Sequence, residues 1–415
     1  MNGPLHARRI TMEVFGDVHH DARVLREAGA LAGAGADVTI VGIRRAGDPA
    51  VERRGNVLIR RVPVGWRRSL PGSGRIAALA PIRLRRTFAF LGRLITLLAW
   101  QRRSARVVPA SDAHHGHDLP GLAIAWAHAR RGRGMLVYDS HELFLESGFN
   151  RELPRLLRRV FGAVEGWLAR RATLVVTVNE SIADELVARY GIARPVVVRN
   201  CPPRWRPEQR DAPRFDRFRE RLPISPERPI VLYQGAFHAD RGIQVTVAAL
   251  ERPELEDAVL VCLGSGVLEG WLIDQTARPE LADRLFVLPQ VPVDRLLEWT
   301  ASADVLVAVY EASDLNNRLS TPNKLYEALA AGVPVVTSDF PERARFIAET
   351  RAGALADPGD PAAVARAIGS LLALPAEQRL DLRRRARRAS LERYNWETES
   401  RTLLDAYRRL LGAGS

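Results

Sequence analysis

The residues best suited to chemistry on a charged ligand lie in RLSTPNKLYEALAAGVPVVTSD, residues 318–339. This segment contains Lys324, the only lysine among the 61 lysines and arginines of the chain. Thr321 can cap a helix there, and Pro322 suits the first helical position because it has no N–H group to leave unpaired. A lysine in the first turn opposes the helix dipole unless an anion lies beside it. The pattern therefore predicts a phosphate at this helix start, held by Lys324 and by the backbone N–H groups of Asn323 and Lys324. The alternative is a surface lysine left by chance.

Glu327 follows Lys324 by three residues, so the two side chains share nearly one face of the predicted helix. One interpretation is an ion pair within the helix. The other is a carboxylate that accepts hydrogen bonds from two hydroxyl groups of a ribose. Both remain open at this point.

Two histidine-rich segments offer further polar side chains. HHGHDLPG, residues 114–121, contains three histidines and Asp118, but their spacing matches no common zinc pattern. We expect the end of a strand, a loop at a ligand cleft and the start of a helix, with Asp118 as the helix cap. A direct role in metal binding is the alternative. His19 and His20 follow the first predicted strand, and either could act as a general base in an inverting reaction. A plain polar loop is the alternative.

Short strands rich in valine and isoleucine alternate with amphipathic helices along the chain, which predicts parallel sheets covered on both faces. A Pro- and Arg-rich stretch at 201–229 interrupts the alternation, and 415 residues suit two domains. We therefore predict two doubly wound halves facing across a cleft, which is the default ligand site. The expected strands are residues 9–15, 36–43, 56–64, 135–140, 173–179, 195–200, 230–236, 258–266, 285–291, 303–310, 333–339 and 353–358.

The net charge of +13 has one main source. Residues 53–111 contain 14 arginines and no acidic residue, so the basicity is local and does not suggest a nucleic-acid-binding protein. Residues 75–106 are also apolar, and they suit an interfacial helix on an anionic membrane; a core helix with a basic face is the alternative. Two cysteines, no apolar stretch of spanning length and no signal-like N-terminus favour a cytoplasmic protein, peripheral on the inner face of the plasma membrane.

Several segments together resemble retaining GT-B glycosyltransferases of the family 4 type, also called group 1. PNKLYEALAAGVPVVTSD resembles their donor-site segment, and YQGAFHADRGI and LGSGVLEGWL resemble the rest of the donor side. HDARVLREAGALAGAGADVTIV, YDSHELFLESG and VNESIADELVARYG are similar to the acceptor side. YNWETES resembles a returning C-terminal helix.

The resemblance implies a fold and a domain plan. The fold would be α/β, GT-B, with two Rossmann-like parallel-sheet domains. Its parts would be an acceptor-binding domain at 1–200, a linker at 201–229, a nucleotide-sugar-binding domain at 230–390 and a helix returning toward the first domain at 391–415.

The resemblance also implies site residues. Glu327 would bind the ribose, Lys324 and the helix start at Thr321 and Asn323 would meet the diphosphate, and Arg241 would neutralise the leaving group. His141 would contact the donor sugar, and His19, His20 and Asp118 would lie on the acceptor side. Gly235 and Gly264 would allow close approach of the backbone. Catalysis would rest on His141, Arg241 and Lys324.

Two positions depart from the family pattern. Leu319 stands where the family commonly has a glutamate eight residues before the ribose glutamate, and Asp314 or Asn316 could take its role. Ala236 stands where an arginine is common. There is no Asp-x-Asp motif, so we expect no metal and no cofactor, with Arg241 and Lys324 supplying the positive charge.

We therefore expect a metal-independent hexosyltransferase-type enzyme (EC 2.4). It would move a sugar from a nucleoside diphosphate sugar to a lipid-linked or cell-envelope glycan, with retention. The alternatives are a GT-B-shaped sugar-nucleotide epimerase and a non-catalytic membrane-surface protein that kept the fold.

Overall fold

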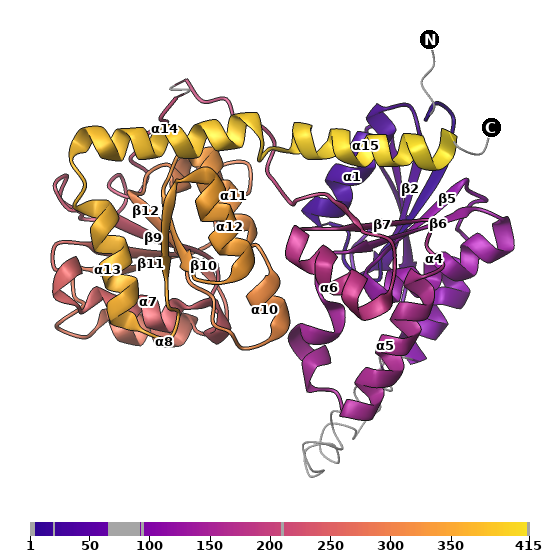
Figure 1. Cartoon of the computed structure of the whole chain (residues 1–415), viewed down its shortest axis with the longest axis horizontal. Coiled ribbons are helices and arrows are strands. Elements are labelled where there is room, and N and C mark those ends of the chain that lie inside the picture. The colour runs from indigo at the N-terminus through magenta and orange to yellow at the C-terminus, as the bar shows by residue number, and fades with distance from the viewer. Residues whose placement is uncertain (1–4, 20, 65–91, 93–94, 209–210, 413–415) are drawn as a thin grey trace. The chain divides into compact units, whose positions relative to one another are not determined.

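The computed structural model describes residues 5–19, 21–64, 92, 95–208 and 211–412. The chain divides into two compact units (Figure 1). Unit 1 comprises Met1–Val198 and Ser400–Ser415, and unit 2 comprises Arg199–Glu399. The last part of the chain thus belongs to the same unit as its beginning.

Unit 1 is built on a sheet with the strand order β3-β4-β2-β1-β5-β6-β7-β8. All neighbouring strands are parallel except β3, which pairs antiparallel with β4. The order reverses between β1 and β5, so β5 lies at the switch point where open parallel sheets bind ligands. The strands are β1 (Arg9–Glu13), β2 (Asp37–Arg44), β3 (Val51–Arg54), β4 (Val57–Pro63), β5 (Ala113–His117), β6 (Met135–Ser140), β7 (Leu174–Thr177) and β8 (Val196–Val197).

Helices pack against this sheet, and each begins or ends where its sequence allows. Asp21 and Asn179 cap the first turns of α1 and α6 with their side chains, and Gly191 ends α6 in a left-handed conformation. The helices are α1 (Ala22–Gly33), α4 (Asp118–Gly132), α5 (Arg155–Ala169), α6 (Glu180–Tyr190) and α15 (Trp396–Gly412), with 3-10 turns η1 (Phe144–Glu146) and η2 (Gly148–Glu152).

Only part of the predicted membrane segment, 75–106, lies in the described residues. Residues 95–104 are helical, and Trp100 among them is buried and donates a hydrogen bond from Nε1 to the Val62 carbonyl over 3.0 Å. Ile95 and Leu98 are exposed. No helix among the described residues is long and apolar enough to cross a membrane.

Unit 2 has a sheet with the strand order β11-β10-β9-β12-β13-β14, and all of its neighbouring strands are parallel. In chain order this is 3-2-1-4-5-6, the doubly wound arrangement with its switch point between β9 and β12. The strands are β9 (Ile230–Ala236), β10 (Val259–Ser265), β11 (Leu285–Leu288), β12 (Val305–Ala308), β13 (Val335–Ser338) and β14 (Gly353–Ala356).

The helices of unit 2 follow these strands in turn. They are α7 (Ile243–Leu250), α8 (Glu269–Thr276), α9 (Leu296–Thr300), α10 (Leu315–Leu319), α11 (Asn323–Ala331), α12 (Pro341–Thr350), α13 (Pro361–Leu372) and α14 (Ala376–Glu392), with 3-10 turns η3 (Ala239–Arg241) and η4 (Pro253–Leu255).

The stretch predicted as a linker, 201–229, lies within unit 2. Its described residues form turns and extended chain, but Cys201, Phe218 and Ile224 are buried in the core of unit 2. The proline-rich composition indicated the lack of regular structure. The apolar residues spaced within the stretch make it part of a domain.

Candidate functional site

The ammonium group of Lys324 is the centre of the candidate site in unit 2. Lys324 is only 7% exposed, and its Nζ lies 4.5 Å from the ring centroid of Tyr233 and 5.3 Å from that of Tyr310. Among the described residues it forms no ion pair with a carboxylate. A buried charge without a counter-charge is costly, and two aromatic faces offset only part of that cost. The arrangement is what a site for an external anion requires.

Three cations converge on the ring of Tyr310, which follows β12. Besides Lys324, the guanidinium carbon of Arg241 lies 4.6 Å and that of Arg343 lies 5.0 Å from the ring centroid. Burial alone would raise the pKa of the Tyr310 hydroxyl, but Lys324, Arg241 and Arg343 outweigh it and lower that pKa. Burial lowers the pKa of Arg343 to about 10, a value at which it is still charged near neutral pH. The cluster is strongly electropositive.

Arg343 also fixes the chain that leads to Lys324. It donates to the Asn317 carbonyl over 2.6 Å, to the Ser320 carbonyl over 3.3 Å and to Ser338 Oγ over 2.9 Å. These bonds tie the end of α10 to β13. The carbonyl bonds also hold the segment directly before α11.

The start of α11 differs by one residue from the prediction. Pro322, not Thr321, is the N-cap, and the first helical residue is Asn323. No side chain caps this end, so the first backbone N–H groups are left for a ligand, as an anion site needs. Gly332 ends the helix in the left-handed conformation, with φ of 67°, as the sequence indicates.

Glu327 points to the neighbouring strand. Its Oε2 accepts a hydrogen bond from Gln234 Nε2 over 2.6 Å, and Gln234 Oε1 accepts one from Thr300 over 2.8 Å. This chain orients the carboxylate at the carboxyl end of β9. The ion pair with Lys324, one of the two interpretations of this glutamate, is not found among the described residues.

The two predicted glycines pack against the same region. Gly235 has φ of +112°, a conformation that favours glycine, and a Cβ there would lie 3.5 Å from Lys324 Nζ. A Cβ on Gly264 would collide with the carbonyl oxygen of Gly235. Gly264 therefore serves the close packing of β10 on β9, and Gly235 leaves the space beside the ammonium open.

The residues considered as substitutes for the glutamate missing at Leu319 lie on α10. Asp314 caps that helix, and its Oδ1 accepts a hydrogen bond from the Asn317 N–H over 2.6 Å. Asn316 is buried. The carboxylate of Asp314 is thus engaged in holding the helix start.

In unit 1, the carboxylate of Asp139 organises the carboxyl ends of β5 and β6. Arg23 of α1 donates to both of its oxygens, over 2.8 and 2.9 Å, and His141 Nε2 lies 3.1 Å from Oδ2. Burial would lower the pKa of His141, but the carboxylates of Asp118 and Asp139 raise it to about 10. His141 is therefore a cation near neutral pH.

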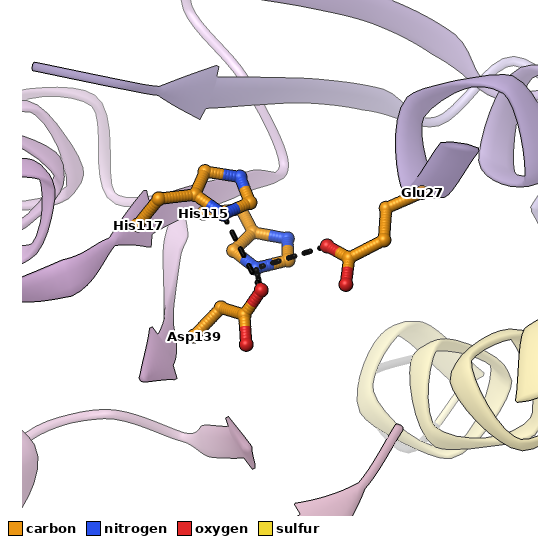
Figure 2. A group of neighbouring side chains, drawn as sticks. All are labelled: Glu27, His115, His117 and Asp139. Atoms are coloured by element: carbon orange, nitrogen blue, oxygen red, sulfur yellow. Dashed lines mark ion pairs between the residues drawn. The ribbon is translucent and has the colours of Figure 1, made fainter. Parts of the chain in front are cut away.

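Figure 2 shows four side chains of this region that have metal-ligand chemistry, Glu27, His115, His117 and Asp139, with ligand atoms that lie within 4.8 Å of one another. The Arg23 guanidinium already lies between the two carboxylates, 3.0 Å from Glu27 Oε1 and 2.8 Å from Asp139 Oδ1. A divalent ion would have to displace this buried cation. The donor set therefore does not fit a metal while Arg23 is in place, and the group is better described as a buried ion-pair network.

A second such group lies under α4. Glu13 Oε1 is 2.7 Å from His114 Nδ1 and 3.2 Å from His128 Nδ1, and all three side chains are buried. Hydrogen bonds of this length account for both contacts without an ion.

The remaining residues predicted on the acceptor side are Asp118, His19 and His20. Asp118 does not cap α4, because His117 is the N-cap and Asp118 is the first helical residue. Its Oδ1 accepts the backbone N–H of His141 over 3.1 Å, which joins the β5 and β6 loops. His19 Nδ1 accepts a hydrogen bond from Arg54 over 2.5 Å. His20 lies outside the described residues.

Sequence reasoning missed Gln234, Tyr310, Arg343, Arg23 and Asp139. Lys324 and Arg343 contact the ring of Tyr310 only because the fold brings these distant segments together. No local sequence pattern could therefore identify Tyr310 or Arg343. Asp139 did carry a signal, because a carboxylate at the end of a predicted parallel strand faces the usual ligand edge of a sheet.

Comparison with known proteins finds a family match in each of the two units. Residues 21–203 match the glycosyl transferase 4-like domain, and residues 228–373 match the glycosyl transferases group 1 domain. A D-inositol 3-phosphate glycosyltransferase from Xylanimonas cellulosilytica is 30% identical over 319 residues, which cover 71% of each chain.

Solved structures resemble the whole chain. A sucrose-phosphate synthase from Thermosynechococcus elongatus has a TM-score of 0.75 at 19% identity, with 98% of this chain and 100% of that chain covered. HepE from Anabaena, solved in complex with UDP-glucose, has a TM-score of 0.67 at 14% identity, with 96% and 99% covered. These likenesses confirm the predicted GT-B fold, and with the sequence matches they show that the chain belongs to the group 1 glycosyltransferases with a 4-like first domain.

Proposed function

We propose that unit 2 binds a nucleoside diphosphate sugar and that the enzyme transfers its sugar with retention of anomeric configuration. The observation that carries the donor assignment is the buried Lys324 ammonium, which has two aromatic faces beside it and no carboxylate partner among the described residues. A diphosphate supplies the missing negative charge. The uncapped start of α11 supplies N–H donors to the same anion.

Each predicted donor residue has a role that its surroundings permit. Glu327, oriented by Gln234, accepts the ribose hydroxyl groups. Lys324 and Arg241 stabilise the charge that develops on the leaving diphosphate. Because these cations already serve that purpose, the reaction needs no divalent metal.

UDP-glucose is the first donor to test, because HepE, with the same fold, was solved with it. The acceptor is a lipid-linked or cell-envelope glycan held by unit 1, with His141 and Asp118 on its polar side. An inositol phosphate belongs in the acceptor panel, since a relative carries that activity in its name. The positive charge of His141 suits an acceptor that carries phosphate.

The test is a thermal-shift screen with UDP, GDP and ADP, followed by a hydrolysis screen of nucleoside diphosphate sugars. A rise in melting temperature with one nucleotide, and sugar release or transfer from the matching donor, are expected. Interconversion of sugar nucleotides without transfer would favour the epimerase alternative. No shift with any nucleotide would favour a non-catalytic protein.

We further propose a cytoplasmic enzyme that is peripheral on the membrane through residues 75–106. Fourteen arginines without an acid at 53–111 support this, since basic residues near an anionic surface contribute about 1 kcal/mol each. Neutralising Arg83, Arg85, Arg86 and Arg93 together should release the protein from anionic vesicles. Equal sedimentation with neutral and anionic vesicles would argue for a core helix instead.

A further inference from the structure

Helix α5 of unit 1 turns an apolar face outward. Four large apolar side chains recur along one side of it at helical spacing, and all are exposed: Leu156 at 72%, Val160 at 48%, Val164 at 40% and Trp167 at 38%. A surface helix of a globular protein normally buries such a stripe. An exposed stripe of this kind marks a surface that binds something.

The inward face of the same helix explains why the stripe cannot simply rotate into the core. Glu165 is 2% exposed and accepts a hydrogen bond from the buried Tyr138 hydroxyl over 2.6 Å. Gly166 leaves room for the Tyr190 ring, which a Cβ would meet at 2.7 Å. A polar contact and a close packing contact thus fix the orientation of α5. The apolar stripe is held outward by the fold.

The exposed side of α5 is also positively charged. Arg155, Arg159, Arg170 and Arg171 are exposed, and Glu165, the only acidic residue between 155 and 171, is buried. Among the described residues, Arg155 and Arg159 form no ion pair. The partner of this face must therefore accept apolar side chains and supply negative charge at their margin.

Trp126 extends the apolar stripe at its C-terminal end, next to Trp167. Trp167 packs edge-on against Trp126 of α4, with ring centroids 5.0 Å apart. The guanidinium of Arg171 covers the Trp167 ring at 3.7 Å, and that of Arg130 lies 5.2 Å from the Trp126 ring. Tryptophan and arginine side by side are typical of groups at the level of lipid headgroups.

We propose that the outward face of α5 lies in the interface of an anionic lipid bilayer. A bilayer satisfies both features at once, since acyl chains take the apolar stripe and headgroup phosphates take the arginines. A second copy of the chain fits worse, because pairing this face with itself would oppose arginine to arginine. The 15 residues of α5 give a contact about 22 Å long, parallel to the membrane plane. The proposal uses none of residues 75–106 and does not depend on the transferase activity.

The test is co-sedimentation of the full chain with vesicles of phosphatidylcholine alone or mixed with phosphatidylglycerol. The double variant Leu156→Gln/Val160→Gln should lower the partition coefficient about tenfold or more, since it removes half of the apolar stripe. The matched control is Ile273→Gln/Val293→Gln, which changes two exposed apolar side chains of unit 2, at 55% and 82%, and should bind like the wild type.

The contribution of the arginines and the depth to which Trp167 enters the bilayer are tested separately. Arg155→Gln/Arg159→Gln should reduce the preference for anionic over neutral vesicles, whereas Arg385→Gln/Arg388→Gln on α14 should not. Brominated lipids should quench tryptophan fluorescence in the wild type and less in Trp167→Phe. Circular dichroism and melting temperature check that every variant folds.

Three outcomes would overturn the proposal. One is an unchanged partition coefficient in the folded Leu156→Gln/Val160→Gln variant together with quenching that does not depend on Trp167. A second is equal binding to neutral and anionic vesicles. The third is a dimer in light scattering that the same variant dissociates without any change in vesicle binding, which would make the face an interface between copies of the chain.

Discussion

Replacing Lys324 with methionine should make the free protein more stable and should weaken its binding of the nucleotide. The ammonium is 7% exposed and is offset only by the rings of Tyr233 and Tyr310. Each cation–aromatic contact contributes about 0.5–2 kcal/mol, whereas the desolvation of a buried ion costs several kcal/mol. Nearby Arg241 and Arg343 add repulsion. Methionine keeps the apolar stem and removes the charge, so we expect a gain of about 1–2 kcal/mol.

Such a gain corresponds to a melting temperature higher by roughly 2–8 °C for a unit the size of unit 2. Nucleotide affinity should fall at the same time. A charge-assisted contact to a phosphate is worth about 1.5–3 kcal/mol, so the dissociation constant for UDP should rise about 10- to 150-fold. Differential scanning fluorimetry without ligand and calorimetric titration with UDP measure the two effects on one protein sample.

Lys324→Arg serves as the matched control because it retains the charge. The larger planar guanidinium must fit beside the rings of Tyr233 and Tyr310, whose centroids lie 4.5 and 5.3 Å from the lysine nitrogen. We expect this variant to keep the fold and to lose at least about tenfold in turnover, or about 1.4 kcal/mol of transition-state stabilisation. A lower melting temperature in Lys324→Met would refute the argument that the free site carries an uncompensated charge, and full activity in Lys324→Arg would make the lysine a matter of chance.

Three further predictions concern Glu327, the independence of the reaction from metals, and His141. Glu327→Ala should weaken UDP binding by about 1.5–3 kcal/mol for each lost ribose bond and leave pyrophosphate binding unchanged, as calorimetry with both ligands would reveal. Transfer activity should persist after brief treatment with EDTA; full loss that Mg²⁺ restores would contradict metal independence. Stability should fall as pH rises from 6.5 toward 10, because the folded state keeps a proton on His141, whose pKa is raised to about 10, that the unfolded chain releases near pH 6.5. The slope is at most about 1.4 kcal/mol per pH unit for this group, and urea unfolding of His141→Gln should show a flatter dependence.

The sequence predicted the strands of both units well because buried parallel strands are short apolar runs that local composition reveals. Two strands were missed. β3 has the sequence VERR, the charged composition of an edge segment. β5 has the sequence AHHGH and was not among the predicted strands because its histidines suggested a loop, although all five of its residues are buried. The start of α11 was predicted to within one residue because Pro322 and the stop at Gly332 bound the helix. Lys324 and Glu327 became candidate site residues because of the lone lysine and the spacing of three residues between them.

The surroundings of those residues were not accessible. Tyr310, Arg343 and Lys324 come from three different segments, and only the sheet order brings them to one ring. The same holds for Arg23 and Asp139, which are 116 residues apart. Asp118 was predicted as a cap from its place before an apolar run, but the backbone N–H of His141 bonds its carboxylate instead. Such contacts depend on tertiary packing, which overrides local preference.

Because α15 completes unit 1, the ribosome supplies the last part of unit 1 only after the whole of unit 2. Tyr407 of α15 shares a hydrogen bond of 2.8 Å with His115 of β5, and Leu411 accepts one from Arg8 next to β1. The sheet of unit 1 leaves the ribosome before unit 2, yet these partners leave it after unit 2. Unit 2, whose residues 199–399 are continuous in the chain, has all its parts before unit 1 does. A nascent chain that stops before residue 400 would therefore present a finished second domain and a first domain whose buried His115 still lacks the tyrosine.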